Sequence, residues 1–322
     1  MGTPDTLQRR NGDGPVTGTQ AAAPAAGGDE TPPVEAQAKS YRYLRITMIG
    51  LLLALAAAVF YQSIRQDSVL ASVSAYYYTP ARSVFVGALI GLGACMIALQ
   101  GMDNAEDTFL NLGGVFAIVV AIVPTGRGAD FDTAVRACQQ AGGAFLTQPA
   151  SKNLACPTVL ALQNATKADV ENNMATLLVV GILALSLAGI MLFRNRTAWE
   201  ETVQRPWVLA GFFAAVLLWG GGLAALVASV DWLAANGHYI AAGGLLACVL
   251  GVAVANALSR QENLYKWVAI GMVIVSVGFI LPWLFGAISL FLVEMVVAFL
   301  FVVFWGVQTA EIEVAARRSA AR

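Results

Sequence analysis

The feature that most constrains the fold of this chain is a series of long apolar runs, poor in charged residues, that recur between residues 44 and 308. Each run is close to the roughly 20 residues that a helix needs to cross a bilayer core of about 30 Å. Over the whole sequence 58% of the residues are hydrophobic and 12% are charged, against roughly 45–50% and about 25% in soluble domains. The sequence therefore predicts an all-α, polytopic transmembrane helix bundle.

About eight membrane spans follow from the apolar runs and the polar residues between them. The last two runs are separated only by the turn around Pro282 and Trp283, so seven spans with one long broken segment is the alternative. The predicted spans are 44–61, 83–100, 108–124, 175–193, 207–229, 239–258, 267–282 and 287–308.

Basic residues near the span ends predict that both termini are cytoplasmic, because such residues are retained on that side of the membrane. With eight spans, most of the 19 basic residues lie inside. With seven spans, the C-terminal cluster of Arg317, Arg318 and Arg322 would lie outside. We therefore expect a multi-pass protein of the plasma (cell) membrane.

Two cytoplasmic tails are expected to flank the transmembrane domain. Residues 1–40 are rich in Gly, Pro and Ala and contain no aromatic residue, so they bury too little apolar surface to offset the entropy of ordering. This segment is predicted to be disordered. The transmembrane domain is expected over residues 41–310, and a short tail over 311–322.

The longest connection, about residues 125–174, is predicted to face the extracytoplasmic side and contains Cys138 and Cys156. An oxidising compartment permits a disulfide between them, which would stabilise the folded loop by roughly 3 kcal/mol in the chain-entropy model. Two free thiols are the alternative. Cys95 and Cys248 lie within apolar runs and are expected to behave as small hydrophobic residues.

Glu294 is the ionisable residue placed inside a predicted span. A charge at the bilayer centre costs at least about 2.5 kcal/mol on insertion scales, so such a residue has a reason to be there. Glu294 is a candidate for binding a cation, carrying a proton or pairing with a substrate amine. Alternatively, it holds the last helix against a neighbour. Since the spans are predicted to offer no second carboxylate or basic residue, a longer proton relay is not expected.

Three consecutive tyrosines, Tyr76, Tyr77 and Tyr78, lie in the predicted outer connection ahead of Pro80. Tyrosines suit the membrane interface, with rings at the headgroups and hydroxyls in water. A headgroup or sugar site is the functional alternative.

Asp231 and His238 are expected to flank a short outer loop over Ser229–Tyr239. They are candidates for contact with a small ligand, or residues that cap helices at the interface.

Glycines within the spans predict places where helices approach closely. Gly87 and Gly91 form a GxxxG pair, and Gly220–Gly222 lie in the middle of the fifth span. The second group predicts close packing or a bend, and alternatively an unwound helix that offers carbonyls to an ion.

The outer segment Ser72–Arg82, together with Asn111–Gly114 and Ala121–Thr125, resembles a group of uncharacterised bacterial, actinobacterial-like multi-span proteins. More distantly, residues 44–125 are similar to the Frag1/DRAM/Sfk1-like small polytopic families. The resemblance implies a multi-span helical fold and no particular activity.

The sequence does not favour an enzyme, because it contains no HExxH motif, no nucleotide-binding glycine loop and a single histidine. We therefore predict a non-enzymatic protein with no cofactor and no metal. The net charge of −1 gives no reason to expect a nucleic-acid partner. The predicted function is a transporter or channel for a small solute or cation. The alternative is a membrane assembly factor, sensor or scaffold that binds protein or lipid partners through its loops.

Overall fold

The computed structural model describes residues 33–101, 103–140, 156–194, 205–259 and 263–320. Within these ranges the chain forms α-helices and one short 3-10 helix, and no strand. The elements are α1 (Pro33–Gln66), η1 (Ser74–Tyr78), α2 (Arg82–Ala98), α3 (Asn104–Ile122), α4 (Ala129–Gln140), α5 (Cys156–Arg194), α6 (Arg205–Ala228), α7 (Val230–Ser259), α8 (Asn263–Leu284) and α9 (Leu290–Ala320).

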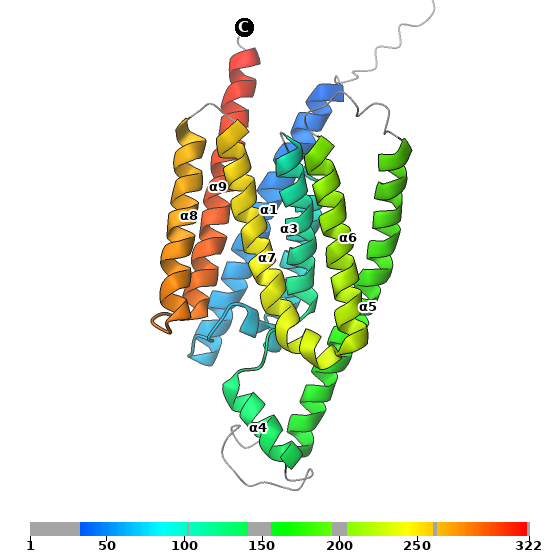
Figure 1. Cartoon of the computed structure of the whole chain (residues 1–322). Helices are drawn as coiled ribbons and strands as arrows, with labels where there is room; N and C mark the ends of the chain where they lie inside the picture. The colour runs from blue at the N-terminus through cyan, green and yellow to red at the C-terminus, as the bar shows by residue number, and fades with distance from the viewer. Residues whose placement is uncertain (1–32, 102, 141–155, 195–204, 260–262, 321–322) are drawn as a thin grey trace, which may run out of the picture.

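The all-α polytopic bundle predicted from the apolar runs is confirmed. In the described residues seven helices are long and apolar enough to cross a membrane, and α2 is a shorter apolar helix. These eight elements coincide with the eight predicted runs, and α4 is an additional helix in the long connection. Gly286, with φ of 72°, lies in the turn between α8 and α9, which run side by side as separate helices (Figure 1). The alternative of seven spans, with the last two apolar runs forming one long broken segment, is therefore wrong.

The start of α1 and the end of α9 lie at the same end of the bundle, here named the tail end (Figure 1). The opposite end, named the loop end, carries α4 and the first half of α5. Which end faces the cytoplasm stays a prediction from the basic residues.

Part of each predicted tail is helical. α1 begins at Pro33, so residues 33–40 belong to a helix instead of a disordered tail, whereas residues 1–32 lie outside the described residues. Proline suits the first position of a helix, and adding residues to an existing helix gains one hydrogen bond each. Likewise, α9 continues to Ala320, through most of the predicted C-terminal tail.

Helix α3 lies at the centre of the bundle (Figure 1) and packs against both α2 and α7. Small residues allow this arrangement: a Cβ atom on Gly93 would lie 2.5 Å from the carbonyl oxygen of Gly114. A Cβ atom on Gly244 of α7 would similarly lie 2.5 Å from the ring of Phe116. Close backbone approach through small residues is how apolar helices associate in membranes.

The predicted Gly87–Gly91 pair plays little part in close packing, because a Cβ atom on Gly87 would meet nothing within 4 Å and one on Gly91 would meet only the Leu51 side chain. Gly220–Gly222 lie within the continuous helix α6.

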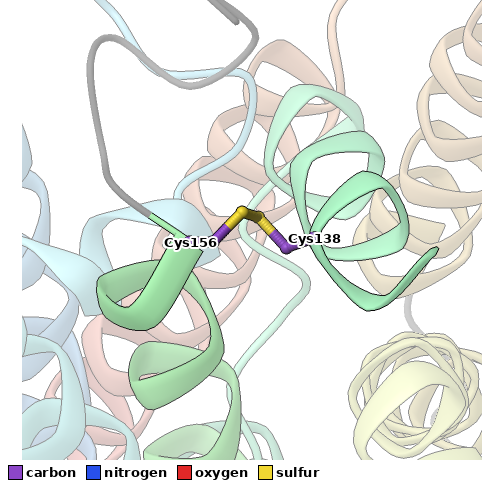
Figure 2. Close-up of a disulfide and its surroundings, with 2 residues drawn as sticks. All are labelled: Cys138 and Cys156. Carbon is purple, nitrogen blue, oxygen red and sulfur yellow. A yellow bond between two sulfur atoms is a disulfide. The ribbon is translucent and has the colours of Figure 1, made fainter. Parts of the chain in front are cut away.

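The disulfide between Cys138 and Cys156 joins the end of α4 to the start of α5 (Figure 2). Their Cα atoms are 5.4 Å apart, within the ordinary range for a disulfide. Phe131 and Val135 of α4 pack with Val159 of α5 in a small cluster that includes both cysteines. This cluster holds α4 against α5 below the membrane-spanning bundle.

The predicted outer loop over Ser229–Tyr239 is wrong. Helix α6 ends at Ala228 and helix α7 begins at Val230, with only Ser229 between them. The hydroxyl of Ser229 accepts a hydrogen bond from the backbone N–H of Trp232 at 3.1 Å, as a helix-capping serine does. No proline interrupts the segment, and the helix continues through Asn236 and past His238.

Candidate functional site

The connection between α1 and α2 folds over the loop end of the bundle and packs against α9. The backbone N–H of Phe291 donates to the carbonyl of Ala71 at 2.9 Å. Tyr76 is fully buried, and its hydroxyl bonds to the hydroxyl of Ser63 and accepts from the N–H of Leu70 at 3.2 Å. These contacts fix the position of η1 relative to α1 and α9.

Glu294, one turn into α9, faces the N-terminal end of η1. Its Oε2 atom accepts from the backbone N–H of Val73 at 2.6 Å, and the Oγ atom of Ser74 lies 2.9 Å from Oε1. The carboxyl therefore faces protein, and it binds the outer connection to the last helix.

His238 lies inside α7 with 2% of its surface exposed, not beside an outer loop as the sequence predicted. Its Nδ1 atom is 2.7 Å from the carbonyl oxygen of Val123, at the end of α3, and its Nε2 atom is 2.8 Å from Ser74 Oγ. The expectation that no basic residue accompanies Glu294 is therefore wrong. Glu294, Ser74 and His238 form one hydrogen-bonded group, here named the Glu–Ser–His cluster.

The cluster shares one proton between its two titratable members. A carbonyl oxygen only accepts, so Nδ1 of His238 carries a hydrogen, and the hydroxyl of Ser74 has one hydrogen to donate. If Ser74 donates to an ionised Glu294, then Nε2 is also protonated and His238 is an imidazolium. If Ser74 donates to Nε2, then Glu294 carries the proton. The cluster is neutral overall in both arrangements.

Tyr77 and Tyr78 stack on arginines at the loop end. The guanidinium of Arg82 lies 4.2 Å from the ring centre of Tyr77 and donates to its hydroxyl at 2.5 Å. The guanidinium of Arg127 lies 3.9 Å from the ring centre of Tyr78. Burial raises the pKa of Tyr77 above its ordinary value and raises the pKa of Tyr78 to about 12. Both phenols are therefore neutral at physiological pH.

Thr125 connects Tyr78 to Tyr239, the neighbour of His238 in α7. Its carbonyl accepts from the hydroxyl of Tyr78 at 2.6 Å, and its side chain donates to the hydroxyl of Tyr239 at 3.2 Å. Tyr239 follows His238 in α7. Tyr77, Tyr78, Tyr239 and His238 thus lie at the loop end of the bundle. Of these four residues, Tyr239 and His238 line the cavity described below.

Asp231 lies apart from the cluster. It forms an ion pair with Lys167 of α5, and its side chain is largely exposed. Asp169, two residues further along α5, pairs with Arg82 at 3.2 Å. These pairs connect α5 to α7 and to the start of α2, and they indicate a structural role for Asp231.

A cavity of about 400 Å³ lies within the bundle next to the Glu–Ser–His cluster. Its walls are apolar side chains of several helices, among them Leu52 of α1, Phe85 and Leu89 of α2, Val249 of α7 and Phe301 of α9. Its polar lining side chains, other than the indole of Trp283, come from residues at the loop end: Ser74, Thr125, His238, Tyr239 and Glu294.

Hydrogen bonding between α7 and α9 closes the bundle beyond the cavity, toward the tail end. The side-chain amide of Gln308 donates to the Oδ1 atom of Asn256 at 2.9 Å, and both residues are buried. Arg45 of α1 lies over the ring of Trp305 at 5.4 Å. The apolar walls therefore separate two polar layers, one at each end of the bundle.

Searches for a matching protein-family model, curated protein and solved structure each found no match. The resemblance to the Frag1/DRAM/Sfk1-like families stays a prediction. Among the described residues no group of three or more His, Cys, Asp or Glu side chains could hold a metal ion.

Ser74 is the member of the Glu–Ser–His cluster that sequence reasoning did not single out as a candidate. Ser74 lies in a connection with no helical or strand periodicity, 164 residues before His238 and 220 before Glu294. The signal available was its position beside the tyrosine run, within the segment Ser72–Arg82 that the sequence analysis singled out.

Proposed function

We propose that this integral membrane protein binds a slender amphiphilic molecule in the cavity and carries or presents it within the membrane. The observation that supports this proposal is the separation of apolar walls from a single polar end at Ser74, His238 and Glu294. A volume of about 400 Å³ lies within the roughly 300–1,000 Å³ of small-molecule sites. A hydrocarbon chain fits the walls, and its polar head meets the cluster.

A small hydrated cation is a poorer fit to the same cavity. An ion that leaves water needs several oxygen ligands in place of its hydration shell, and the described lining offers polar groups at one end only. Of the transport functions predicted from the sequence, we therefore favour transport of an amphiphile over transport of a cation. An assembly or scaffold role would use the loop end, including α4, without requiring the cavity.

The experiment that tests the proposal fills the cavity with a side chain. Gly243 lines the cavity and Gly278 of α8 does not, while a Cβ atom would meet nothing within 4 Å at either position. Binding of a brominated long-chain amphiphile to protein in lipid nanodiscs is followed by quenching of Trp283, which lines the cavity. The Trp283→Phe variant supplies the background.

We expect Gly243→Phe to weaken saturable quenching at least about tenfold, because the ring occupies the ligand's space. Gly278→Phe is the matched control and is expected to bind as the wild type does. Equal quenching in both variants would show that the chain does not enter the cavity, and the proposal would then be wrong.

Acyl transfer is a second candidate function, favoured by the 2.8 Å contact between Ser74 Oγ and His238 Nε2. A serine next to an imidazole is the arrangement of an activated nucleophile. However, the backbone N–H of Val73, a nearby donor of the kind that stabilises an oxyanion, donates to Glu294. This contact supports a non-enzymatic role. Covalent labelling of Ser74 by a fluorophosphonate, lost in Ser74→Ala and in His238→Gln, would instead support the enzyme.

A further inference from the structure

The titratable groups that line the cavity are one carboxyl, one imidazole and one phenol. Glu294 comes from α9, and His238 and Tyr239 come from α7. The lining residues of α1, α2, α3, α8 and η1 carry no titratable group. Arg82 and Arg127, the arginines stacked on the tyrosines at this end, do not line the cavity. A ligand head therefore meets one acid and one base that share a proton.

The carboxyl of Glu294 has hydrogen-bonding capacity left for a ligand. An ionised carboxylate accepts at about four lone-pair positions. The N–H of Val73 and the hydroxyl of Ser74 use two of them. Because Glu294 also lines the cavity, the remaining positions are available to a donor there. An anionic head would meet this carboxylate without a lining arginine or lysine to compensate.

We infer that the ligand is a long-chain primary amine whose ammonium head pairs with Glu294. This inference rests on the proposed function and names its ligand class. The ammonium group supplies three donors, and the oxygen acceptors that line the polar end of the cavity include the carboxylate of Glu294 and the hydroxyls of Tyr239 and Thr125. A charged donor on a charged acceptor makes roughly twice as strong a hydrogen bond as a neutral pair.

Binding of the ammonium releases one proton. Before binding, Glu294 and His238 together hold one proton and are neutral. The ammonium brings one positive charge into an apolar cavity, and an imidazolium would make the site positive. The shared proton therefore goes to water, the hydroxyl of Ser74 turns to donate to Nε2 of His238, and a hydrogen of the ammonium takes its place on Oε1 of Glu294. The bound state contains an ammonium, a carboxylate and a neutral imidazole, and no covalent bond changes.

The test compares three probes that share one hydrocarbon chain: dodecylamine, dodecanol and dodecanoate. Their binding to the wild-type protein in nanodiscs is measured by isothermal titration calorimetry in two buffers of different ionisation enthalpy, with protein-free nanodiscs as the background. We expect the amine to bind at least about tenfold more tightly than the other two probes. We also expect release of about one proton per amine and none per alcohol.

Glu294→Gln keeps the shape of the side chain and removes its charge, so it is expected to abolish the preference for the amine while alcohol binding persists. Glu171→Gln is the matched control, because Glu171 is exposed on α5, away from the cavity. If Glu294→Gln does not fold, the three-probe comparison and the proton count on the wild-type protein decide the question.

Three outcomes would overturn the inference. Equal affinity for dodecylamine and dodecanol would show that the carboxylate of Glu294 does not select the head group. Tighter binding of dodecanoate than of dodecylamine would show that the site prefers an anion. Amine binding without proton release would contradict the shared proton. In each of these cases a loss of binding in Gly243→Phe would still support the cavity as an amphiphile site. If no probe binds above the background, the proposed function fails as well.

Discussion

At the scale of single residues, the carboxyl of Glu294 stabilises the loop end because it accepts hydrogen bonds from two buried residues, Val73 and Ser74. Glu294→Ala would leave the N–H of Val73 and the hydroxyl of Ser74 without this acceptor. An unsatisfied buried donor costs about 1–3 kcal/mol. We therefore expect Glu294→Ala to lower the free energy of unfolding by that amount, and Glu294→Gln, which keeps one acceptor oxygen, to lower it less.

Denaturant unfolding in mixed micelles measures the difference. Glu171→Ala on the exposed face of α5 is the control and is expected to change the unfolding free energy by less than about 0.5 kcal/mol. An Ala variant as stable as the wild type would show that η1 is held by its other contacts.

Tyr78 is expected to lose its phenol proton at a higher pH than an ordinary tyrosine does. Burial raises its pKa from 10.0 to about 12 in the folded protein. The folded state therefore holds this proton more tightly than the unfolded state does. Its contribution to stability is complete below about pH 10 and is lost as the pH rises through about 12.

Tyrosinate absorbance of the wild type minus that of Tyr78→Phe measures this pKa. The difference is expected to show one step near pH 12. A step near pH 10 would mean that Tyr78 is hydrated, in contradiction to its packing against Arg127 and Thr125.

At the scale of helices, close packing at Gly93 and Gly114 determines how α2 and α3 meet. Gly114→Ala would place a methyl group 2.6 Å from the carbonyl oxygen of Gly93. Such overpacking typically costs about 1–3 kcal/mol, and we expect this loss in the free energy of unfolding. Gly87→Ala is the matched control in α2, because its methyl group would meet nothing within 4 Å, and alanine favours a helix.

Thermal unfolding of the two variants gives the comparison. A lower midpoint for Gly114→Ala and an unchanged or higher midpoint for Gly87→Ala are expected. Equal midpoints would show that α2 and α3 can separate without loss.

The disulfide is expected to stabilise a helix pair more than the whole bundle. Cys138 and Cys156 are 18 residues apart, and closing a loop of this size contributes about 3 kcal/mol in the chain-entropy model. Reduction should therefore increase hydrogen exchange in α4 while α3 and α7 keep their protection. Faster exchange in α3 after reduction would indicate that the bundle depends on the bond.

The elements that sequence reasoning predicted well are those defined by nearby residues. Each apolar run carries its own signal for a span, and Cys138 and Cys156 were the cysteines of one loop. The Glu–Ser–His cluster has no such signal, because Ser74 is 164 residues from His238 and 220 from Glu294. Only the packing of η1 against α7 and α9 joins them. The expected loop at Ser229–Tyr239 failed because polar residues there were taken as a break, although Ser229 caps a continuing helix.

At the scale of the whole molecule, the two ends of the bundle differ in chemistry and should face different compartments. The eight apolar helices bring the start of α1 and the end of α9 to the tail end, whereas the disulfide and α4 lie at the loop end (Figure 1). A disulfide persists in an oxidising compartment, and basic residues near span ends are retained in the cytoplasm. Both rules assign the tail end to the cytoplasm.

Labelling with a membrane-impermeant maleimide tests this orientation. In a background with all four cysteines replaced by serine, single cysteines are introduced at Thr133 of α4 and Lys39 of α1, which are both exposed. We expect Thr133→Cys to react in intact cells, and Lys39→Cys to react only after permeabilisation. The reverse pattern would place the loop end and its cluster in the cytoplasm. Reaction of both in intact cells would mean that the two ends share a compartment, which the arrangement of α1 through the bundle does not allow. The expected pattern would place the polar end of the cavity, and therefore the amine head, at the outer face of the membrane.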